Sequence, residues 1–144
     1  MRLFVTRVEG IKVPKVSTHL AMGNVQLLSV EYGINEKFSA GDSFEVKISP
    51  EVNVRVRKSK ETKEAMVSLE LKLFKKNSSE YPMWLKIKNQ AEFRWDTDNG
   101  NVDVMLRTLC AAHLLSYMRP LVTQLTTMSD LPPLTLPLIN FHED

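Results

Sequence analysis

Hydrophobic and polar side chains alternate along several stretches of the chain, as they do in strands with one buried face. The clearest alternation lies in residues 67–74 and 84–95. A similar pattern runs through residues 44–56, where Pro50 favours an edge position or a bulge within one long strand. Residues 25–34 also alternate, and their even-numbered positions form the more apolar face. These stretches predict several antiparallel strands.

Helical spacing of apolar residues follows the strands. Residues 102–115 carry it, with Asn101 or Asp103 available as the amino-terminal cap. Pro120 predicts a break or kink near Ser116 rather than one continuous helix. A second buried stripe is expected at Tyr117, Leu121, Leu125 and Met128.

Residues 131–141 form a proline-rich apolar segment, the strap. Its three prolines lack backbone donors and fix φ, which predicts extended chain. Sheet, then helix, then strap indicates an α+β fold with the helices on one face. Two interpretations of the strap stay open. It either covers the sheet, or it is a mobile lid beside a groove that accepts extended polypeptide.

Composition indicates one globular domain, residues 1–144, in which the first 24 residues have no defined structure from the pattern. The chain is 43% hydrophobic and 25% charged, and no run approaches the ~20 apolar residues of a membrane span. Charges at Arg2 and Arg7 interrupt the amino terminus too early for a secretory signal. We therefore expect a cytoplasmic protein without membrane insertion.

Side chains that could perform catalysis or bind metal are sparse. Cys110 is the only cysteine, and the three histidines lack ligand spacing, so we expect no metal, no cofactor and no enzyme activity. Cys110 and His113 are interpreted as packed helix residues. Asp96 and Asp98 are interpreted as turn residues. The isolated glycines form no phosphate-binding loop.

Basic residues gather at 55–60 and at Lys72, Lys86 and Lys88. A solvated strand face is the preferred interpretation, and contact with an acidic partner or nucleic acid is the alternative. The net charge of +2 is too small to imply nucleic acid, which we do not expect as a partner.

Residues 115–141 resemble the tail of the SecB family of protein-export chaperones. In that family a tyrosine-any-arginine motif opens the long helix, and here Tyr117 and Arg119 match it. A short proline-containing apolar loop follows, matched by residues 131–136, and then an asparagine-phenylalanine pair, matched by Asn140 and Phe141. The double-proline loop is similar to that of SecB-like chaperones associated with toxin–antitoxin systems.

The resemblance implies a SecB-like, four-stranded antiparallel sheet with a long helix, assembled as a dimer or a tetramer. It also implies an ATP-independent holdase for unfolded client polypeptide, including a dedicated client such as an antitoxin. The lid residues implied by position are Leu131, Pro133, Leu134 and Leu136. From the burial pattern we add further candidate peptide contacts at Tyr117, Trp84, Phe93 and Trp95.

Two departures from the family pattern concern the motor ATPase SecA. The sequence stops at Asp144, without the family's carboxy-terminal helix, and Lys86 and Lys88 stand where export-type members present acidic residues. Both features weaken the expectation of delivery to SecA. Two alternatives to a holdase are a SecB-fold interaction module without chaperone activity and a hotdog-type ligand-binding protein or enzyme. The second would depend on His113.

Overall fold

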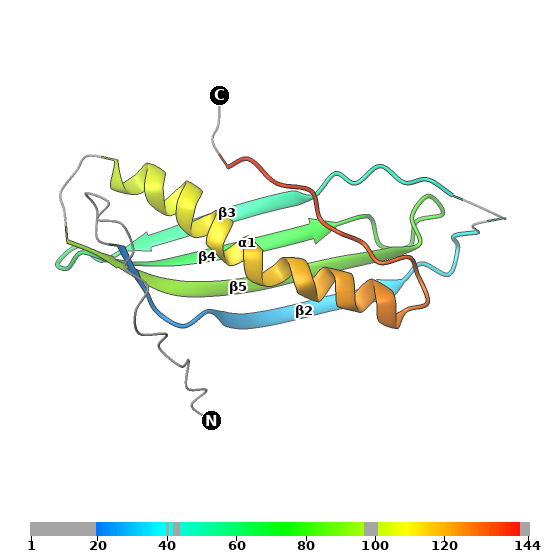
Figure 1. The fold of residues 1–144 in the computed structure, drawn as a ribbon, viewed down its shortest axis with the longest axis horizontal. Helices are drawn as coiled ribbons and strands as arrows, with labels where there is room; N and C mark the ends of the chain where they lie inside the picture. The colour runs from blue at the N-terminus through cyan, green and yellow to red at the C-terminus, as the bar shows by residue number, and fades with distance from the viewer. Residues whose placement is uncertain (1–19, 40, 42–43, 97–100, 142–144) are drawn as a thin grey trace, which may run out of the picture.

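The computed structural model describes residues 20–39, 41, 44–96 and 101–141. In this part of the chain five strands are followed by one helix: β1 (Leu20–Met22), β2 (Gln26–Ile34), β3 (Glu51–Lys58), β4 (Glu64–Leu73), β5 (Met83–Trp95) and α1 (Val102–Met128). The strands form one antiparallel sheet in which β5 pairs with β4 on one side and with β1 and β2 on the other, while β3 lies outside β4 (Figure 1). The α+β prediction is confirmed.

The sheet contains one more described strand than the four that were predicted. The additional strand, β1, is only three residues long and pairs with the end of β5, from Phe93 to Trp95. Three residues are too few to show an alternation in the sequence. Residues 1–19 and most of the turn at residues 96–100 lie outside the described residues.

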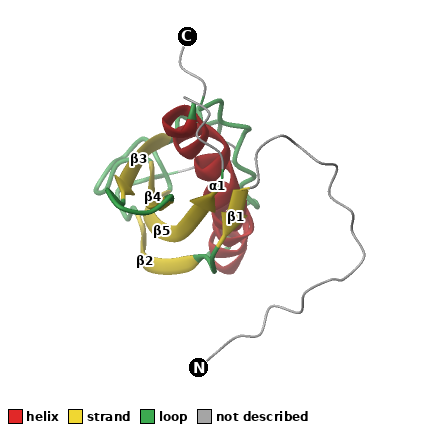
Figure 2. Ribbon diagram, turned by 90° about the vertical axis from the view of Figure 1, so that its left-hand side faces the viewer, coloured by secondary structure: helices red, strands yellow, loops and turns green. Residues whose placement is uncertain are grey.

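Helix α1 covers one face of the sheet, which we call the covered face; the other is the open face (Figure 2). Alternate residues of β4 and β5 point under the helix, and Leu69, Ile87 and Phe93 are almost completely buried there. They pack in one cluster with Leu114 and Met118 of α1. The predicted alternation in residues 67–73 and 84–95 therefore corresponds to the two faces of the sheet.

Residues 44–50 are not a strand, contrary to the prediction of one long strand through Pro50. Strand β3 begins at Glu51, opposite Lys72, and its neighbour β4 ends at Leu73. Phe74 then takes a positive φ of 63° and the chain turns away. Alternation gives a segment a buried face, but it cannot supply the partner strand that residues 44–50 lack in the described structure.

The predicted break near Ser116 is also wrong, because α1 runs continuously from Val102 to Met128 with Pro120 inside it. Proline removes one intrahelical hydrogen bond, that to the carbonyl of Ser116. Pro120 and Ser116 are both exposed, so water can hydrate the free carbonyl. Asn101 occupies the cap position without a side-chain hydrogen bond, and Asp103 instead pairs with Lys58 at 3.1 Å.

The buried stripe of α1 differs from the predicted one. Tyr117 and Met128 are 51% and 76% exposed, and Leu121 and Leu125 are half-buried. The buried apolar side chains are Leu106, Cys110, Ala111, Leu114, Leu115, Met118 and Val122. Apolar residues occur on nearly every side of this helix, so their spacing alone does not identify the side that packs on the sheet.

Strand β2 has a bulge between Leu27 and Ser29. Val30 and Tyr32 lie opposite Ile87 and Leu85 and share the covered face, as predicted for the even-numbered positions. The bulge interrupts that register, so Leu28 lies on the open face instead. A bulge inserts one residue and reverses the side to which the following positions point. The prediction is therefore wrong for Leu28, and also for Gln26, which lies opposite Gln90 on the open face.

Gly33 of β2 lies opposite Trp84 of β5, whose indole ring covers it on the open face. A Cβ atom at Gly33 would come within 2.6 Å of Trp84 Nε1, which is closer than a stable contact. Lys76 Nζ lies 4.8 Å from the centroid of the same ring, on which it adds a cation–π contact.

We expect Gly33→Ala to lower the free energy of unfolding by about 1–3 kcal/mol, because the indole must move. Urea denaturation measures the change. Gly23→Ala is the matched control, since its Cβ would meet Glu92 Cβ at an ordinary 3.5 Å, and we expect a change within about 0.5 kcal/mol. Equal losses in the two variants would contradict the prediction.

Candidate functional site

Side chains of α1 hold the strap against the helix. Arg119 Nη2 donates to the carbonyl of Leu136 at 2.8 Å, and Thr123 Oγ1 donates to the carbonyl of Leu134 at 2.8 Å. The backbone N–H of Leu134 donates to Thr126 Oγ1 at 3.0 Å. Leu136 is 1% exposed and belongs to the core. The strap thus covers part of the core, and its backbone conformation from Leu134 to Leu136 is fixed by helix side chains.

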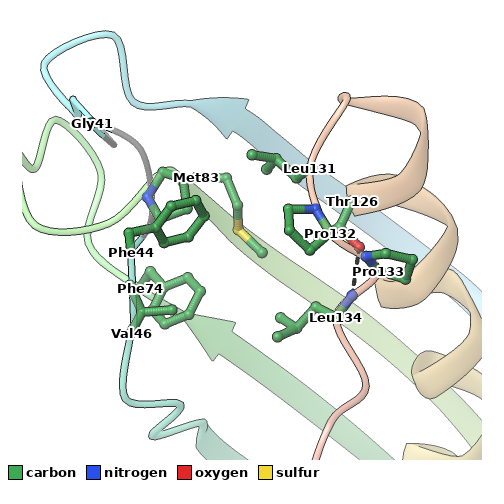
Figure 3. A pocket seen from close by; sticks show the side chains of 11 residues that line it. Gly41, Phe44, Val46, Phe74, Met83, Thr126, Leu131, Pro132, Pro133 and Leu134 are labelled. Atoms are coloured by element: carbon green, nitrogen blue, oxygen red, sulfur yellow. Dashed lines mark hydrogen bonds between the residues drawn. The ribbon is translucent and has the colours of Figure 1, made fainter.

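An apolar hollow of about 510 Å³, the strap hollow, lies between the first residues of the strap and the segment before β3. The strap side is formed by Leu131, Pro132, Pro133 and Leu134. Opposite them lie Phe44, Val46, Phe74 and Met83 (Figure 3). The described side chains that line it carry no charge, and the Thr126 hydroxyl already bonds the strap. This surface is therefore suited to apolar side chains.

A second hollow of about 580 Å³, the β3 hollow, lies near the far end of the strap. Val52 and Val54 of β3 form one side, and Val104 and Arg107 of α1 form another, with Phe141 of the strap between them. Strand β3 pairs with β4 only, so within the described structure its outer edge keeps free N–H and C=O groups. An extended peptide can pair with such an edge while placing alternate side chains in the hollow.

The candidate peptide contacts from the sequence occupy four different environments. Leu131, Pro133 and Leu134 line the strap hollow, whereas Leu136 is buried. Tyr117 is exposed on α1. The remaining three are β5 residues: Phe93 and Trp95 are buried beneath α1, and Trp84 lies on the open face, over Gly33. The structure therefore brings three of the eight together at one hollow.

The wall that faces the strap consists of residues for which the sequence pattern predicted no binding role. Phe44 and Val46 were interpreted as the buried face of a strand, and no contact role followed for Phe74 or Met83. The available signal was the pair of aromatic residues, Phe44 and Phe74, at positions just outside the elements that contain the sheet core. Phe74 stacks on Tyr81 with ring centroids 4.7 Å apart, which fixes it at the turn after β4.

The reactive side chains of the described residues form no catalytic arrangement. Burial raises the pKa of the Cys110 thiol to about 12, so it is no nucleophile at neutral pH. His113 is exposed rather than packed as predicted, and its ring contacts Tyr117 at 5.4 Å between centroids. No three histidine, cysteine or acidic side chains of residues 20–39, 41, 44–96 and 101–141 gather as a metal site. Within the same ranges, α1 lacks the apolar length of a membrane-spanning helix.

The sequence model of one family, described as preprotein translocase subunit SecB, matches residues 17–143. The chain belongs to the SecB family. No curated protein matches the sequence. Membership in this family supports a chaperone function and a protein that acts by binding.

Two solved structures share the fold. One is a SecB-like chaperone of Mycobacterium tuberculosis, in complex with a ChAD peptide from an antitoxin; it has a TM-score of 0.65 at 19% identity and covers 84% of this chain and 90% of its own. The other is a protein of unknown function from Streptococcus agalactiae, with a TM-score of 0.50 at 13% identity, covering 85% of this chain and 100% of its own. The SecB-like fold inferred from residues 115–141 is confirmed.

Substitution of Thr126 tests whether side-chain hydrogen bonds from α1 hold the strap of this SecB-family chain in place. We expect Thr126→Val to leave the N–H of Leu134 without an acceptor, at a cost of about 1–3 kcal/mol in unfolding free energy. Amide exchange at residues 131–136 should accelerate, as measured by mass spectrometry.

Thr127→Val is the control, because the exposed Thr127 hydroxyl bonds only its own helix, at the carbonyl of Thr123. Its exchange at the strap should equal that of the wild type. Indistinguishable exchange in the Thr126 and Thr127 variants would show that the side-chain hydrogen bonds do not hold the strap.

Proposed function

We propose that this SecB-family protein is an ATP-independent holdase that binds unfolded polypeptide in the strap hollow. The observation that carries the proposal is the hollow itself: it is large, uncharged, and walled on one side by the proline-stiffened residues 131–134. The antitoxin peptide bound by the M. tuberculosis relative supports a peptide as the client, with an antitoxin as one candidate. Leu131, Pro133 and Leu134 would contact the client from the strap.

Binding requires no catalytic group. An apolar client side chain buried in the strap hollow contributes about 1.5–3 kcal/mol before ordering costs. The free edge of β3 would add main-chain hydrogen bonds that do not depend on the client sequence. Folded proteins keep both their apolar side chains and their backbone groups satisfied internally. The chain would therefore select polypeptides that are unfolded.

Leu134 provides the direct test, because it lines the strap hollow and is only half-buried. We expect Leu134→Ser to weaken binding of an unfolded apolar client peptide by about tenfold or more, which corresponds to about 1.4 kcal/mol. Fluorescence anisotropy measures the affinity, and aggregation of a denatured client measures holdase activity.

Leu138→Ser is the matched control, since Leu138 lies on the same strap but is 86% exposed and away from the hollow. Phe44→Ser alters the opposite wall and should reproduce the loss. Circular dichroism should show all three variants folded. If the Leu134 and Phe44 variants bind clients as the wild type does, the strap is only structural and the protein is an interaction module of the same fold.

A second copy of the chain is the proposed cover for an exposed apolar surface of α1 and β2. Leu109 and Met128 are 60% and 76% exposed on α1, and Leu27, Val30 and Ile34 are exposed on β2. Tyr32 Oη donates to Ser129 Oγ at 2.7 Å, so the end of α1 lies beside β2. Exposed apolar side chains that gather on one surface often mark an interface with another chain. We therefore propose a homo-oligomer.

We expect Leu109→Glu with Tyr117→Glu to shift the protein toward monomer, because two charges would be buried at the interface. Sedimentation velocity measures the change. Val104→Glu is the control, since Val104 is a 56% exposed apolar residue of the same helix on the side of the β3 hollow. A wild-type protein that sediments as a monomer would refute the oligomer without affecting the test of the strap hollow.

A further inference from the structure

The open face of the sheet contains a hollow of its own. It measures about 180 Å³ and lies where β2, β3, β4 and β5 meet. Arg55 and Arg57 of β3 form one side and Lys88 of β5 another, while Leu28 comes from the bulge of β2. No described helix covers this face (Figure 2). We call it the open-face hollow.

The open-face hollow has an excess of positive charge. Its one carboxylate is Glu70, whose oxygens lie 3.2 Å from Lys88 Nζ and 3.5 Å from Lys72 Nζ. Burial raises the pKa of Glu70, but the Lys88 hydrogen bond and the charges of Lys86, Lys88 and Lys72 outweigh it and lower the pKa overall. Glu70 is therefore ionised at neutral pH and already paired with Lys72 and Lys88.

The side chains of Arg55 and Arg57 differ from that of Glu70 in this respect. Neither guanidinium lies within ion-pairing distance of a carboxylate among the described residues. Arg55 lies opposite Ser68, which in turn lies opposite Gln90, so its row across the sheet is uncharged. Two exposed guanidinium groups, two residues apart on one strand face, are well placed for bidentate bonds to carboxylates.

The bulge of β2 adds an independent feature. It places Leu28, 45% exposed, on the open face and in the lining of the open-face hollow. The bulge changes the direction of the Leu28 side chain, so the backbone of β2 sets the position of Leu28 on the open face. A sheet face that serves only to present charged side chains to water gains nothing from an exposed leucine. The position of Leu28 offers an apolar contact directly next to the cations.

We propose that the open face docks an acidic segment of a partner polypeptide, with a carboxylate between Arg55 and Arg57 and a neighbouring apolar side chain on Leu28. Nucleic acid fits this face less well. Glu31, Glu51 and Glu92 are on the same face by register and would repel a continuous phosphate backbone. The site is separated from the strap hollow by the sheet, so it does not depend on the holdase proposal.

The test uses a fluorescent peptide in which glutamate and aspartate alternate with leucine. Its counterpart carries glutamine and asparagine instead. We expect the wild-type chain to bind the acidic peptide more tightly, and Arg55→Gln with Arg57→Gln to reduce that affinity at least tenfold. Leu28→Ser should reduce it as well. Rising salt should weaken binding, because the pairs are partly exposed.

Arg94→Gln is the matched control, since Arg94 is on the same face but pairs with Glu64 at 3.2 Å and does not line the hollow. It should leave the affinity unchanged. The proposal is overturned if the acidic and amide peptides bind equally. Equal losses in the Arg94 variant and the double variant would also overturn it, as would tighter binding of a single-stranded DNA through the same arginines.

Discussion

The rest of the structure depends on the packing of α1 against the alternating apolar face of β4 and β5. The helix covers the long-strand core, and residues such as Leu69, Ile87 and Met118 are nearly inaccessible to water. Burial of this many apolar side chains is the main term that stabilises the fold. It also fixes the direction of α1 across the sheet, so the strap begins beside the turn that contains Phe74.

Hydrogen bonds from α1 side chains hold the strap in a fixed position, so that its first residues form one wall of the strap hollow. Arg119, Thr123 and Thr126 bond the backbone of the strap at Leu134 and Leu136, and Leu136 is inserted into the core. The preceding prolines stiffen the part that stays outside. A preorganised wall loses little conformational entropy when a peptide binds, which favours affinity. The same helix thus supplies both the core and one side of the candidate site.

Helix α1 covers only one face of the sheet, so the open face is available to bind a second partner. Client binding is proposed for the covered side, between the strap and residues 44–46, while the excess of arginine lies on the open side. The sheet separates the two surfaces, so both could be occupied at once. An acidic partner on the open face would leave the strap hollow accessible. Such an arrangement would connect a held polypeptide to a second protein without competition for one groove.

The parts of the molecule that depend on local chemistry were predictable from the order of the residues. Alternation defined the faces of β4 and β5, the prolines excluded helix from the strap, and the motifs from Tyr117 to Phe141 indicated the family. These signals are local because side-chain period and proline geometry act within a few residues. The side of α1 that is buried became evident only from its packing on the sheet, since apolar residues occur nearly all round the helix. Three-dimensional packing likewise determines that Leu136 is buried while Leu138 is exposed, that Phe44 lines a hollow instead of lying in a strand, and that Leu28 in the bulge lies on the open face. Each of those outcomes depends on which distant segment lies opposite, and spacing along the chain carries no information about that partner.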